Sequence, residues 1–216
     1  MSYLNPDERL VFVDLETAGL ETWRPIIQIA AIAVNSDMQE LESFEAKIRF
    51  SESVASPESL RKNHYSSERW DAEARNPREV AKDFEQLLRR HATVDQTAAS
   101  GRVFQVAQLV AHNAAFDGAF LRAWFSRMKL FLPASPRVLC TLQRAIWLFH
   151  ENKSCTPPVD FKLQTLCQYF DVPLRSEDAH DALADVRATV SLYREMKEIQ
   201  QSSTAQRAAR GSSLAA

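Results

Sequence analysis

Residues 10–17 of the chain, with the sequence LVFVDLET, join a run of large apolar side chains to a pair of carboxylates. The apolar half, residues 10–13, is β-branched and aromatic and predicts a buried β-strand. Side chains alternate between the two faces of a strand, so Asp14 and Glu16 are expected to project from the same face. Neighbouring carboxylates repel each other unless a cation lies between them, and oxygen-only ligands select Mg²⁺ or Mn²⁺. An Asp-x-Glu triplet is common, however, and a solvated strand end is the simpler interpretation when it stands alone.

The rest of the chain predicts an α/β domain with a mixed central sheet flanked by helices. Apolar runs at 26–34 and 43–50 predict two more strands, and the short gaps favour a meander. Helical spacing then begins at Pro77, a favourable first residue of a helix. The remaining predicted elements are a polar loop at 92–101, a strand at 108–111, and helices at 114–128, 139–149, 162–170 and 182–199. We expect one folded domain, residues 1–200, and a disordered tail at 201–216 that is rich in Ser and Ala.

The composition of the 216 residues, with 45% hydrophobic and 25% charged side chains, is typical of a soluble globular protein. Lys and Arg number 26 and Asp and Glu 28, so the net charge of −2 excludes a protein that coats duplex DNA non-specifically. The cysteines, Cys140, Cys155 and Cys167, are odd in number and lack CxxC spacing, which argues against disulfides or a zinc ribbon. The polar N-terminus and the lack of an apolar run of about 20 residues favour a cytoplasmic protein without a membrane partner.

Two later segments add acidic side chains and a histidine. The segment HNAAFD follows a predicted strand and places Asp117 in the first turn of the next helix, where the helix dipole favours a carboxylate. The segment HDALAD begins with His180 in a loop and ends with Asp185 one turn into the last helix. A histidine so close to a metal-ligand carboxylate suits a general base, because its ordinary pKa is about 6.5. Each segment also has a structural explanation, since Asp117 can be a helix-start acid and Asp181 a helix cap.

Together the three segments resemble the motifs of the DEDDh 3′–5′ exonucleases, a family that includes proofreading exonuclease subunits, RNase T and oligoribonuclease. The matching residues, in order along the chain, are Asp14, Glu16, Asp117, His180 and Asp185. The resemblance extends over roughly residues 10–196, nearly the whole predicted domain. A sister subclass has tyrosine four residues before the last aspartate; this chain has aspartate there, which favours the histidine subclass.

The resemblance implies a ribonuclease H-like fold and a metal-dependent 3′–5′ exonuclease. Two Mg²⁺ or Mn²⁺ ions would be held by the carboxylates of Asp14, Glu16, Asp117 and Asp185. His180 would accept a proton from the attacking water. The expected reaction hydrolyses the terminal phosphodiester bond of single-stranded nucleic acid, with DNA favoured over RNA, and releases 5′-mononucleotides.

Substrate contacts are predicted less directly. The candidates that the resemblance implies, or that adjoin the motifs, are Thr17, Ala18, Leu20, His112 and Asn113. Leu20 would be a platform or wedge for the last base, although ordinary loop packing explains it equally well. His112 and Asn113 would alternatively order the turn before the helix. A basic rim is suggested by Arg122, Arg127, Lys129, Lys153 and Lys162, and base stacking by Trp70, Trp124 and Trp147, of which Trp124 belongs to an apolar stripe.

The sequence departs from the family pattern at Gln28, where relatives often carry an acid, and at residues 63–65, where Asn-His-Tyr replaces a His-Gly-Ile-like step. The expected partners are a nucleic-acid 3′ end and either a polymerase or a second copy of the chain. Rival functions are RNA 3′-end trimming or oligoribonuclease activity, a catalytically silent nucleic-acid-binding subunit, and a small-molecule phosphatase. The complete set of carboxylates with the histidine argues against the silent subunit, and the histidine spacing argues against the phosphatase.

Overall fold

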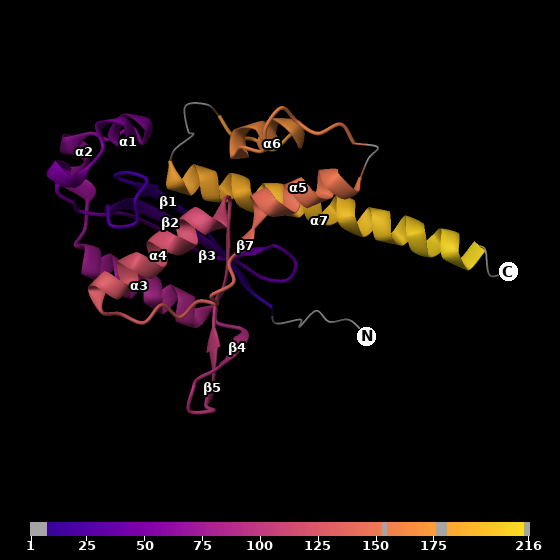
Figure 1. Ribbon diagram of the computed structural model, residues 1–216, viewed down its shortest axis with the longest axis horizontal. Helices are drawn as coiled ribbons and strands as arrows, with labels where there is room; N and C mark the ends of the chain where they lie inside the picture. The colour runs from indigo at the N-terminus through magenta and orange to yellow at the C-terminus, as the bar shows by residue number, and fades with distance from the viewer. Residues whose placement is uncertain (1–7, 153–154, 176–180, 214–216) are drawn as a thin grey trace.

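A five-stranded mixed sheet with the strand order β3-β2-β1-β6-β7 forms the centre of the protein (Figure 1). The computed structural model describes residues 8–152, 155–175 and 181–213. The strands are β1 (Leu10–Thr17), β2 (Ile26–Val34), β3 (Glu40–Lys47), β6 (Gln108–Ala111) and β7 (Leu139–Cys140). The first three form an antiparallel meander, and β6 and β7 add to the β1 edge in parallel. The predicted mixed sheet and its meander are confirmed.

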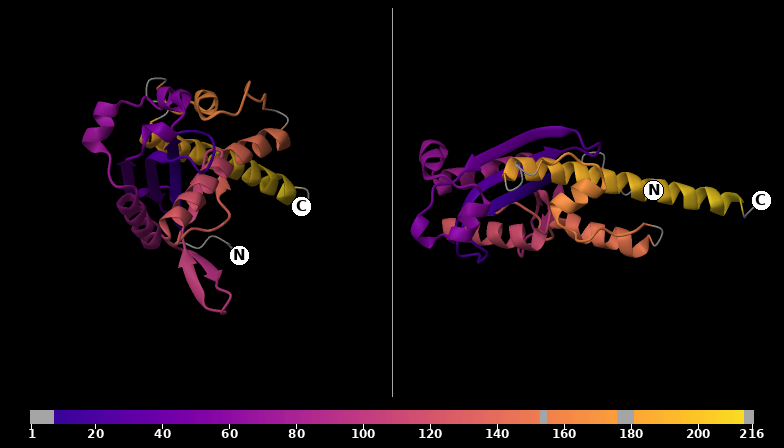
Figure 2. Two further views of the ribbon diagram at one scale, coloured as in Figure 1. Left: turned by 60° about the vertical axis from the view of Figure 1, so that its left-hand side comes forward. Right: turned by 90° about the horizontal axis from the view of Figure 1, so that it is seen from above.

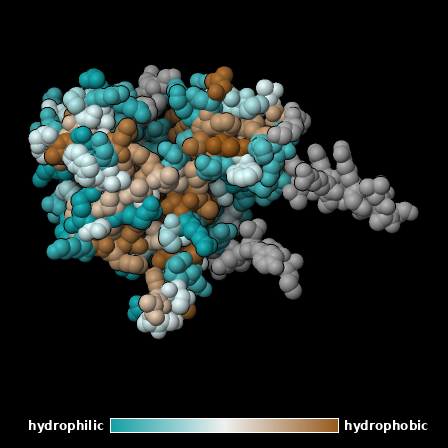
Figure 3. All heavy atoms as spheres, in the orientation of Figure 1, coloured by the Kyte–Doolittle hydropathy of each residue, from teal (hydrophilic) through white to brown (hydrophobic). Residues whose placement is uncertain are grey.

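Helices cover both faces of this sheet (Figure 2). One face is covered by α3 (Pro77–Arg90) and α4 (Ala114–Met128), whose buried side chains form the largest apolar cluster. The other face is covered by the start of α7 (Ala182–Ser213), which then continues past the sheet (Figure 1). Against α7 pack α5 (Thr141–Glu151) and α6 (Leu163–Tyr169). Figure 3 shows that apolar residues gather over the middle of the face that carries α4 and α5, among polar side chains.

The two faces of β1 differ in a way that sets the position of the site. Val11, Val13 and Leu15 point to the side of α3 and α4 and are buried there. Leu10 and Phe12 point to the other side, where they pack with the first turns of α7. Because side chains alternate, Asp14 and Glu16 continue the row of Leu10 and Phe12. The α7 side of β1 therefore changes from apolar to acidic toward its C-terminal end.

Several elements differ from the sequence-based expectations. The third strand lies at 40–47 rather than 43–50, and the helix expected at 139–149 begins with the short strand β7. The segment expected to be a loop at 92–101 contains β4 (Val94–Thr97), which pairs with β5 (Val103–Val106) in a hairpin that projects from the body (Figure 1). Short polar strands of this kind carry little apolar periodicity, so the pattern did not indicate them.

The segment between β3 and α3 also holds helices that the sequence analysis missed. These are a 3₁₀ turn, η1 (Glu52–Val54), and the helices α1 (Pro57–Lys62) and α2 (Ser67–Glu73). At the other end of the chain, α7 reaches Ser213 instead of ending at residue 199. Residues 200–213 contain Ala, Gln and Arg, which favour a helix without forming an apolar face. The domain boundary at residue 200 and disorder of the tail stay predictions. Among the helices of the described residues, none has the length and hydrophobicity to cross a membrane.

Candidate active site

Three carboxylates meet where β1 ends and α7 begins. Asp14 and Glu16 come from β1, and Asp185 comes from the first turn of α7. One carboxylate oxygen from each lies within 4.8 Å of those of the other two. Glu16 and Asp185 are only 7% and 8% exposed, while Asp14 is half-buried. The predicted common face of Asp14 and Glu16 and their approach to Asp185 are confirmed.

Asp117 supplies a fourth carboxylate from the other side of the sheet edge. The left-handed backbone of Asn113, with φ of 60°, turns the chain from β6 into α4, and Asp117 follows in the first turn. β6 pairs with β1 only from Leu10 to Phe12, so the edge of β1 beyond Phe12 is left to α4. There the carboxylate of Asp117, which is 3% exposed, accepts a hydrogen bond from the backbone N–H of Leu15. We call Asp14, Glu16, Asp117 and Asp185 the acidic cluster.

Burial disfavours the charged forms of Asp14, Glu16 and Asp117, and the charges of neighbouring acids add to this effect at Asp14 and Glu16. Burial is the largest cause of the raised pKa of Asp14, and the charges of Asp117 and Glu16 raise it further. Burial, followed by the charge of Asp185, raises the pKa of Glu16 to about 9. Burial also raises the pKa of Asp117 to about 8. A group of oxygen donors held together against such repulsion fits a divalent cation of the Mg²⁺ or Mn²⁺ type.

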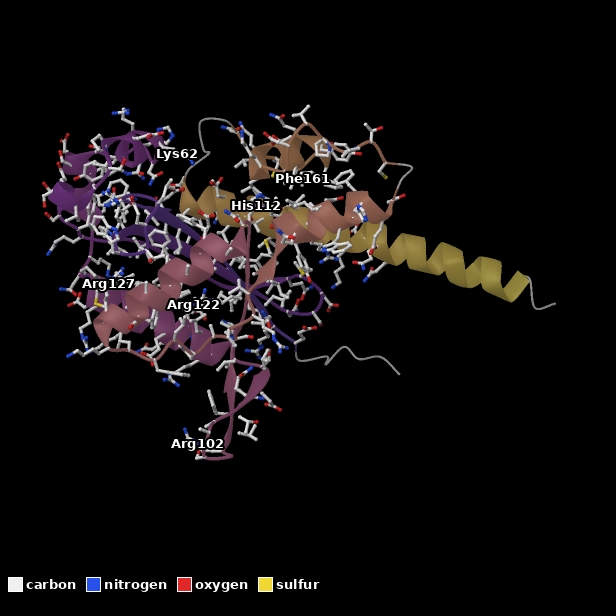
Figure 4. All side chains as sticks on the ribbon, viewed as in Figure 1. Lys62, Arg102, His112, Arg122, Arg127 and Phe161 are labelled. Atoms are coloured by element: carbon white, nitrogen blue, oxygen red, sulfur yellow. The ribbon has the colours of Figure 1, made fainter. Side chains whose placement is uncertain are left out.

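Two adjoining cavities open beside the acidic cluster. The smaller, about 200 Å³, is lined by the whole cluster together with Thr17, Leu20, Ser59 and neighbouring side chains. The larger, about 780 Å³, extends from the cluster between α1 and the segment that leads into α6. Lys62, His112 and Asp185 line both cavities. Figure 4 shows Lys62 of α1 and Phe161 on either side of His112 at the top of the molecule.

The residues predicted to contact substrate after the first motif have different surroundings. Leu20 is 81% exposed and lines the smaller cavity. The hydroxyl of Thr17 donates to the carbonyl of Gly19 at 2.7 Å and braces the loop. Ala18 is fully buried against Ile27 and Trp70, and its backbone N–H and carbonyl are both hydrogen-bonded within the protein. Ala18 therefore supports the loop that carries Leu20.

His112 joins three segments next to the larger cavity. Its Nε2 lies 3.1 Å from the carbonyl of Phe161 and its Nδ1 lies 2.9 Å from the hydroxyl of Thr141. A carbonyl only accepts, so Nε2 donates to it, and the neutral ring then accepts from Thr141 at Nδ1. Burial lowers the pKa of His112, which favours the neutral ring. This geometry favours the interpretation that His112 orders the turn, while Asn113 is exposed and lines the cavity.

The predicted general base, His180, lies outside the described residues. The neighbouring Asp181 is described, and its Oδ1 accepts hydrogen bonds from the backbone N–H groups of Leu183 and Ala184 at 3.2 Å each. Asp181 thus caps α7, as its position in the sequence suggested. The role of His180 stays a prediction.

Only some of the residues predicted to form a basic rim or to stack on bases are exposed or line a cavity. Trp70 and Trp124 are each 3% exposed, so the prediction of stacking for Trp70 is wrong and Trp124 belongs to the core. Trp147 is 59% exposed. Arg122 and Lys129 are exposed on and just after α4, and Lys162 lines the larger cavity. Nη1 of Arg127 donates a hydrogen bond to the carbonyl of Thr22 at 2.6 Å. Lys153 lies outside the described residues.

Two residues beside the acidic cluster, Lys62 at the end of α1 and Asn63 at its C-terminal cap, were not among the predicted site residues. The side chain of Asn63, at the C-terminal cap of this helix, donates to the carbonyl of Thr17 at 2.9 Å and fastens the helix to the end of β1. The charge of Lys62 lowers the pKa of Glu16, against the effects of burial and of Asp185. The Ser-Pro step at residues 56–57 was the available signal, because proline is favoured at the first position of a helix.

A mixed sheet that gathers carboxylates from β1, α4 and α7 beside an open cleft is the architecture of the ribonuclease H-like fold. The chain belongs to the RNase T family of exonucleases, because the family model described as "Exonuclease" matches residues 11–193. The predicted DEDDh family and fold are thereby confirmed.

Curated relatives include large polymerases and a multifunctional protein. The chain is 31% identical over 185 residues to DNA polymerase III PolC-type of Halalkalibacterium halodurans, covering 85% of this chain and 11% of the polymerase. It is 40% identical over 90 residues to a putative bifunctional exonuclease/endonuclease protein of Mycobacterium tuberculosis, covering 42% of this chain and 13% of that protein. The chain thus spans only a small part of the relatives it matches.

Among solved structures, exonuclease I shares the fold. One structure of exonuclease I matches with a TM-score of 0.70 at 20% identity, covering 88% of this chain and 41% of that one. Escherichia coli exonuclease I in complex with a dA16 oligonucleotide matches with a TM-score of 0.68 at 20% identity, covering 88% and 41%.

Proposed function

We propose that this protein is a 3′–5′ exonuclease that hydrolyses the terminal phosphodiester bond of single-stranded DNA and releases 5′-mononucleotides. The observation that carries the proposal is the meeting of four buried or half-buried carboxylates at the junction of two open cavities. Family membership supplies the reaction class, and the cleft supplies a place for a strand end.

The acidic cluster suits a pair of Mg²⁺ or Mn²⁺ ions. When bound, such ions stabilise the charge on the attacking and leaving oxygens of a displacement at phosphorus. Asp14, Glu16 and Asp185 offer oxygens from one side, and Asp117 offers them from α4. The backbone N–H of Leu15 fixes the direction of the Asp117 carboxylate before any cation arrives. His180, as the general base, removes the proton of the attacking water.

The cleft is proposed to hold the last nucleotides of one strand. Leu20 lies at the smaller cavity as an apolar surface for the terminal base. Lys62 lines both cavities and supplies positive charge for a phosphate next to the acidic cluster. The larger cavity, at about 780 Å³, falls in the range of about 300–1,000 Å³ that is usual for ligand pockets. That space suits the end of a single strand better than a duplex.

DNA is favoured over RNA because of the relatives. Several are DNA polymerases III of the PolC type, and Escherichia coli exonuclease I has been solved with single-stranded DNA. A polymerase partner is proposed on the same basis, with a second copy of the chain as the alternative. RNA 3′-end trimming is the alternative activity, since the contacts that would read a 2′-hydroxyl are set by loop geometry.

The test uses two 5′-labelled single strands of one sequence, one DNA and one RNA, incubated with Mg²⁺ and separately with EDTA. We expect a metal-dependent ladder that shortens from the 3′ end, faster on DNA, with 5′-mononucleotides as the product. A faster RNA ladder would redirect the proposal to RNA trimming. If neither strand is cut although Mn²⁺ binds, the exonuclease proposal is wrong and a silent binding subunit replaces it.

A further inference from the structure

Gln28 is a buried amide on β2, 2% exposed, at the edge of the acidic cluster. It lies directly opposite Glu16 in the β1–β2 pair, so the two side chains share the face that α7 covers. Its Nε2 donates to Oε1 of Glu45 at 3.0 Å and to Oδ2 of Asp181 at 3.3 Å. One amide nitrogen carries two N–H groups, so a single glutamine satisfies both carboxylates. An ionised acid at this position would donate to neither and would face two like charges.

The link from Gln28 continues through Asp181 into α7. While Oδ2 of Asp181 receives the Gln28 amide, its Oδ1 caps the backbone N–H groups of Leu183 and Ala184. The backbone carbonyl of Asp181 accepts from the N–H of Asp185 at 2.9 Å. The same residue thus connects the sheet to the helical turn that carries Asp185.

We propose that Gln28 is a positioning residue of this exonuclease: by holding Asp181 against the sheet, it sets where α7 begins and how Asp185 meets Asp14 and Glu16. The inference rests on the proposed function, because it assigns Gln28 an effect on the metal affinity of the acidic cluster. It also gives a physical reason for an amide at this position, because an amide can donate to both Glu45 and Asp181. Asp181, which Gln28 holds, directly precedes the first turn of α7. Because Asp185 lies in that turn, the position of Asp181 restricts the position of Asp185.

The first experiment measures Mn²⁺ affinity without nucleic acid, by calorimetry, for Gln28→Glu and Gln28→Leu. Loss of a group that orients a metal ligand typically weakens metal affinity by about 10–100-fold. We expect the Kd for Mn²⁺ to rise about 10-fold or more in Gln28→Glu, and less in Gln28→Leu, which removes the donor without adding charge. At saturating Mn²⁺ the KM for a DNA oligonucleotide should stay close to that of the unchanged protein, because Gln28 is not among the described residues that line the two cavities.

A rescue experiment separates positioning from a general loss of packing. In the double variant Gln28→Glu/Asp181→Asn, the amide lies on the other partner and donates back to the new carboxylate. The side-chain oxygen of Asn can still cap α7. We expect the double variant to recover part of the Mn²⁺ affinity lost in Gln28→Glu, because the contact with residue 181 is restored while Glu45 still faces the new carboxylate. Such recovery measures the coupling between two residues in direct contact. Melting curves of each variant show whether it is folded, and Gln28→Leu keeps the test decisive if Gln28→Glu is not.

Gln108 provides a matched control. Its Nε2 also joins a strand to a loop, donating to the carbonyl of Arg137 at 2.7 Å and to that of Leu109 at 3.1 Å. Gln108→Glu should leave Mn²⁺ affinity unchanged, and an equal loss there would overturn the proposal. Wild-type affinity in both Gln28 variants, or no recovery in the double variant, would overturn it as well. Asp185→Ala is the reference: if it binds Mn²⁺ normally, the acidic cluster is not the metal site and the proposed function itself fails.

Discussion

The carboxylate of Glu42 and most carboxylates of the acidic cluster have pKa values shifted in opposite directions. On β3, Glu42 receives the guanidinium of Arg90 at 2.6 Å and lies 2.9 Å from Nε2 of His91. These hydrogen bonds, that of Arg90 foremost, hold the pKa of Glu42 below its usual value. In the acidic cluster, burial and neighbouring acids raise the pKa of Glu16 to about 9, and Lys62 only partly opposes them.

The difference indicates which carboxylates stabilise the fold and which serve the chemistry. At Glu42 the chain supplies its own cationic partner, so the charge is balanced once the protein has folded. At the acidic cluster the chain places several carboxylates together without enough cationic side chains to neutralise them. A bound metal would neutralise the remaining negative charge. Charged groups assembled at a cost in stability are typical of functional sites. The following predictions test this contrast.

The largest effect is expected from Asp14→Ala. Asp14 lies within 4.8 Å of both Glu16 and Asp185, so its removal leaves a gap in the middle of the proposed metal site. Turnover of a 5′-labelled DNA strand should fall to background, while circular dichroism and the melting transition show an intact fold. Residual metal-dependent activity near the normal rate would show that the reaction takes place elsewhere.

His180→Ala is expected to have the next largest effect. A general base contributes about 10²–10⁴-fold to the rate, and the metal ligands stay in place when it is removed. We therefore expect kcat to fall by about that factor while Mn²⁺ affinity stays the same. Unchanged kcat would remove His180 as the base, and a parallel loss of Mn²⁺ binding would assign it to the metal site instead.

Most of the acidic cluster could be predicted from the sequence. The alternation of β1 predicted the common face of Asp14 and Glu16, and the starts of two helices predicted Asp117 and Asp185. The places of these residues in the fold were predictable because each depends on local periodicity and on a motif of a few residues, while their catalytic roles stay predictions. The meander and the helices at 77–90 and 114–128 were predictable for the same reason.

The missing parts depend on contacts between distant segments. Asn63 reaches Thr17 across 46 positions, and Gln28 reaches Asp181 across 153. A side-chain amide that bridges two elements has no periodic signature, so the sequence showed Gln28 only as a departure from a pattern. The helix that carries Lys62 is short and exposed, which leaves it without the apolar stripe that indicates longer helices.

A smaller effect is expected on the stability of the metal-free protein when the pH changes. The acidic cluster and Glu42 should contribute in opposite directions. Because the folded pKa of Asp117, about 8, and that of Glu16, about 9, exceed the usual values of these acids, the folded protein binds more protons than the unfolded chain. In EDTA the contribution of Asp117 and Glu16 to stability is therefore fully present below their unfolded pKa values and is lost as the pH rises toward 9. Mn²⁺ should restore it, and by more at high pH.

The variant Asp117→Asn tests whether repulsion within the acidic cluster lowers the stability of the metal-free protein. It removes one repelling charge, so in EDTA at pH 8 we expect the melting temperature to rise by a few degrees, although exonuclease activity is lost. For a chain of this size, about 1 kcal/mol corresponds to about 2–4 °C. Glu85→Gln is the control, because it removes a carboxylate of α3 that pairs with Arg89 at 2.6 Å outside the acidic cluster; it should not raise the melting temperature. A lower melting temperature for Asp117→Asn would show that the cluster is not under repulsion.

The smallest effect is expected from Glu42→Gln. Because the folded pKa of Glu42 is lowered, its contribution to stability is present above the unfolded pKa and is lost as the pH falls through the folded value. The side chain of Glu42 is 32% exposed, and exposed ion pairs contribute about 0.2–1 kcal/mol. At pH 7 Glu42→Gln should therefore lower the free energy of unfolding by no more than about 1 kcal/mol, with kcat and Mn²⁺ affinity unchanged. Denaturant titrations over a series of decreasing pH values check the sign: the difference between the variant and the unchanged protein should shrink as the pH falls through the lowered pKa of Glu42. If Glu42→Gln instead raised stability at pH 7, as Asp117→Asn should, the two groups of carboxylates would not differ in the way their partners indicate.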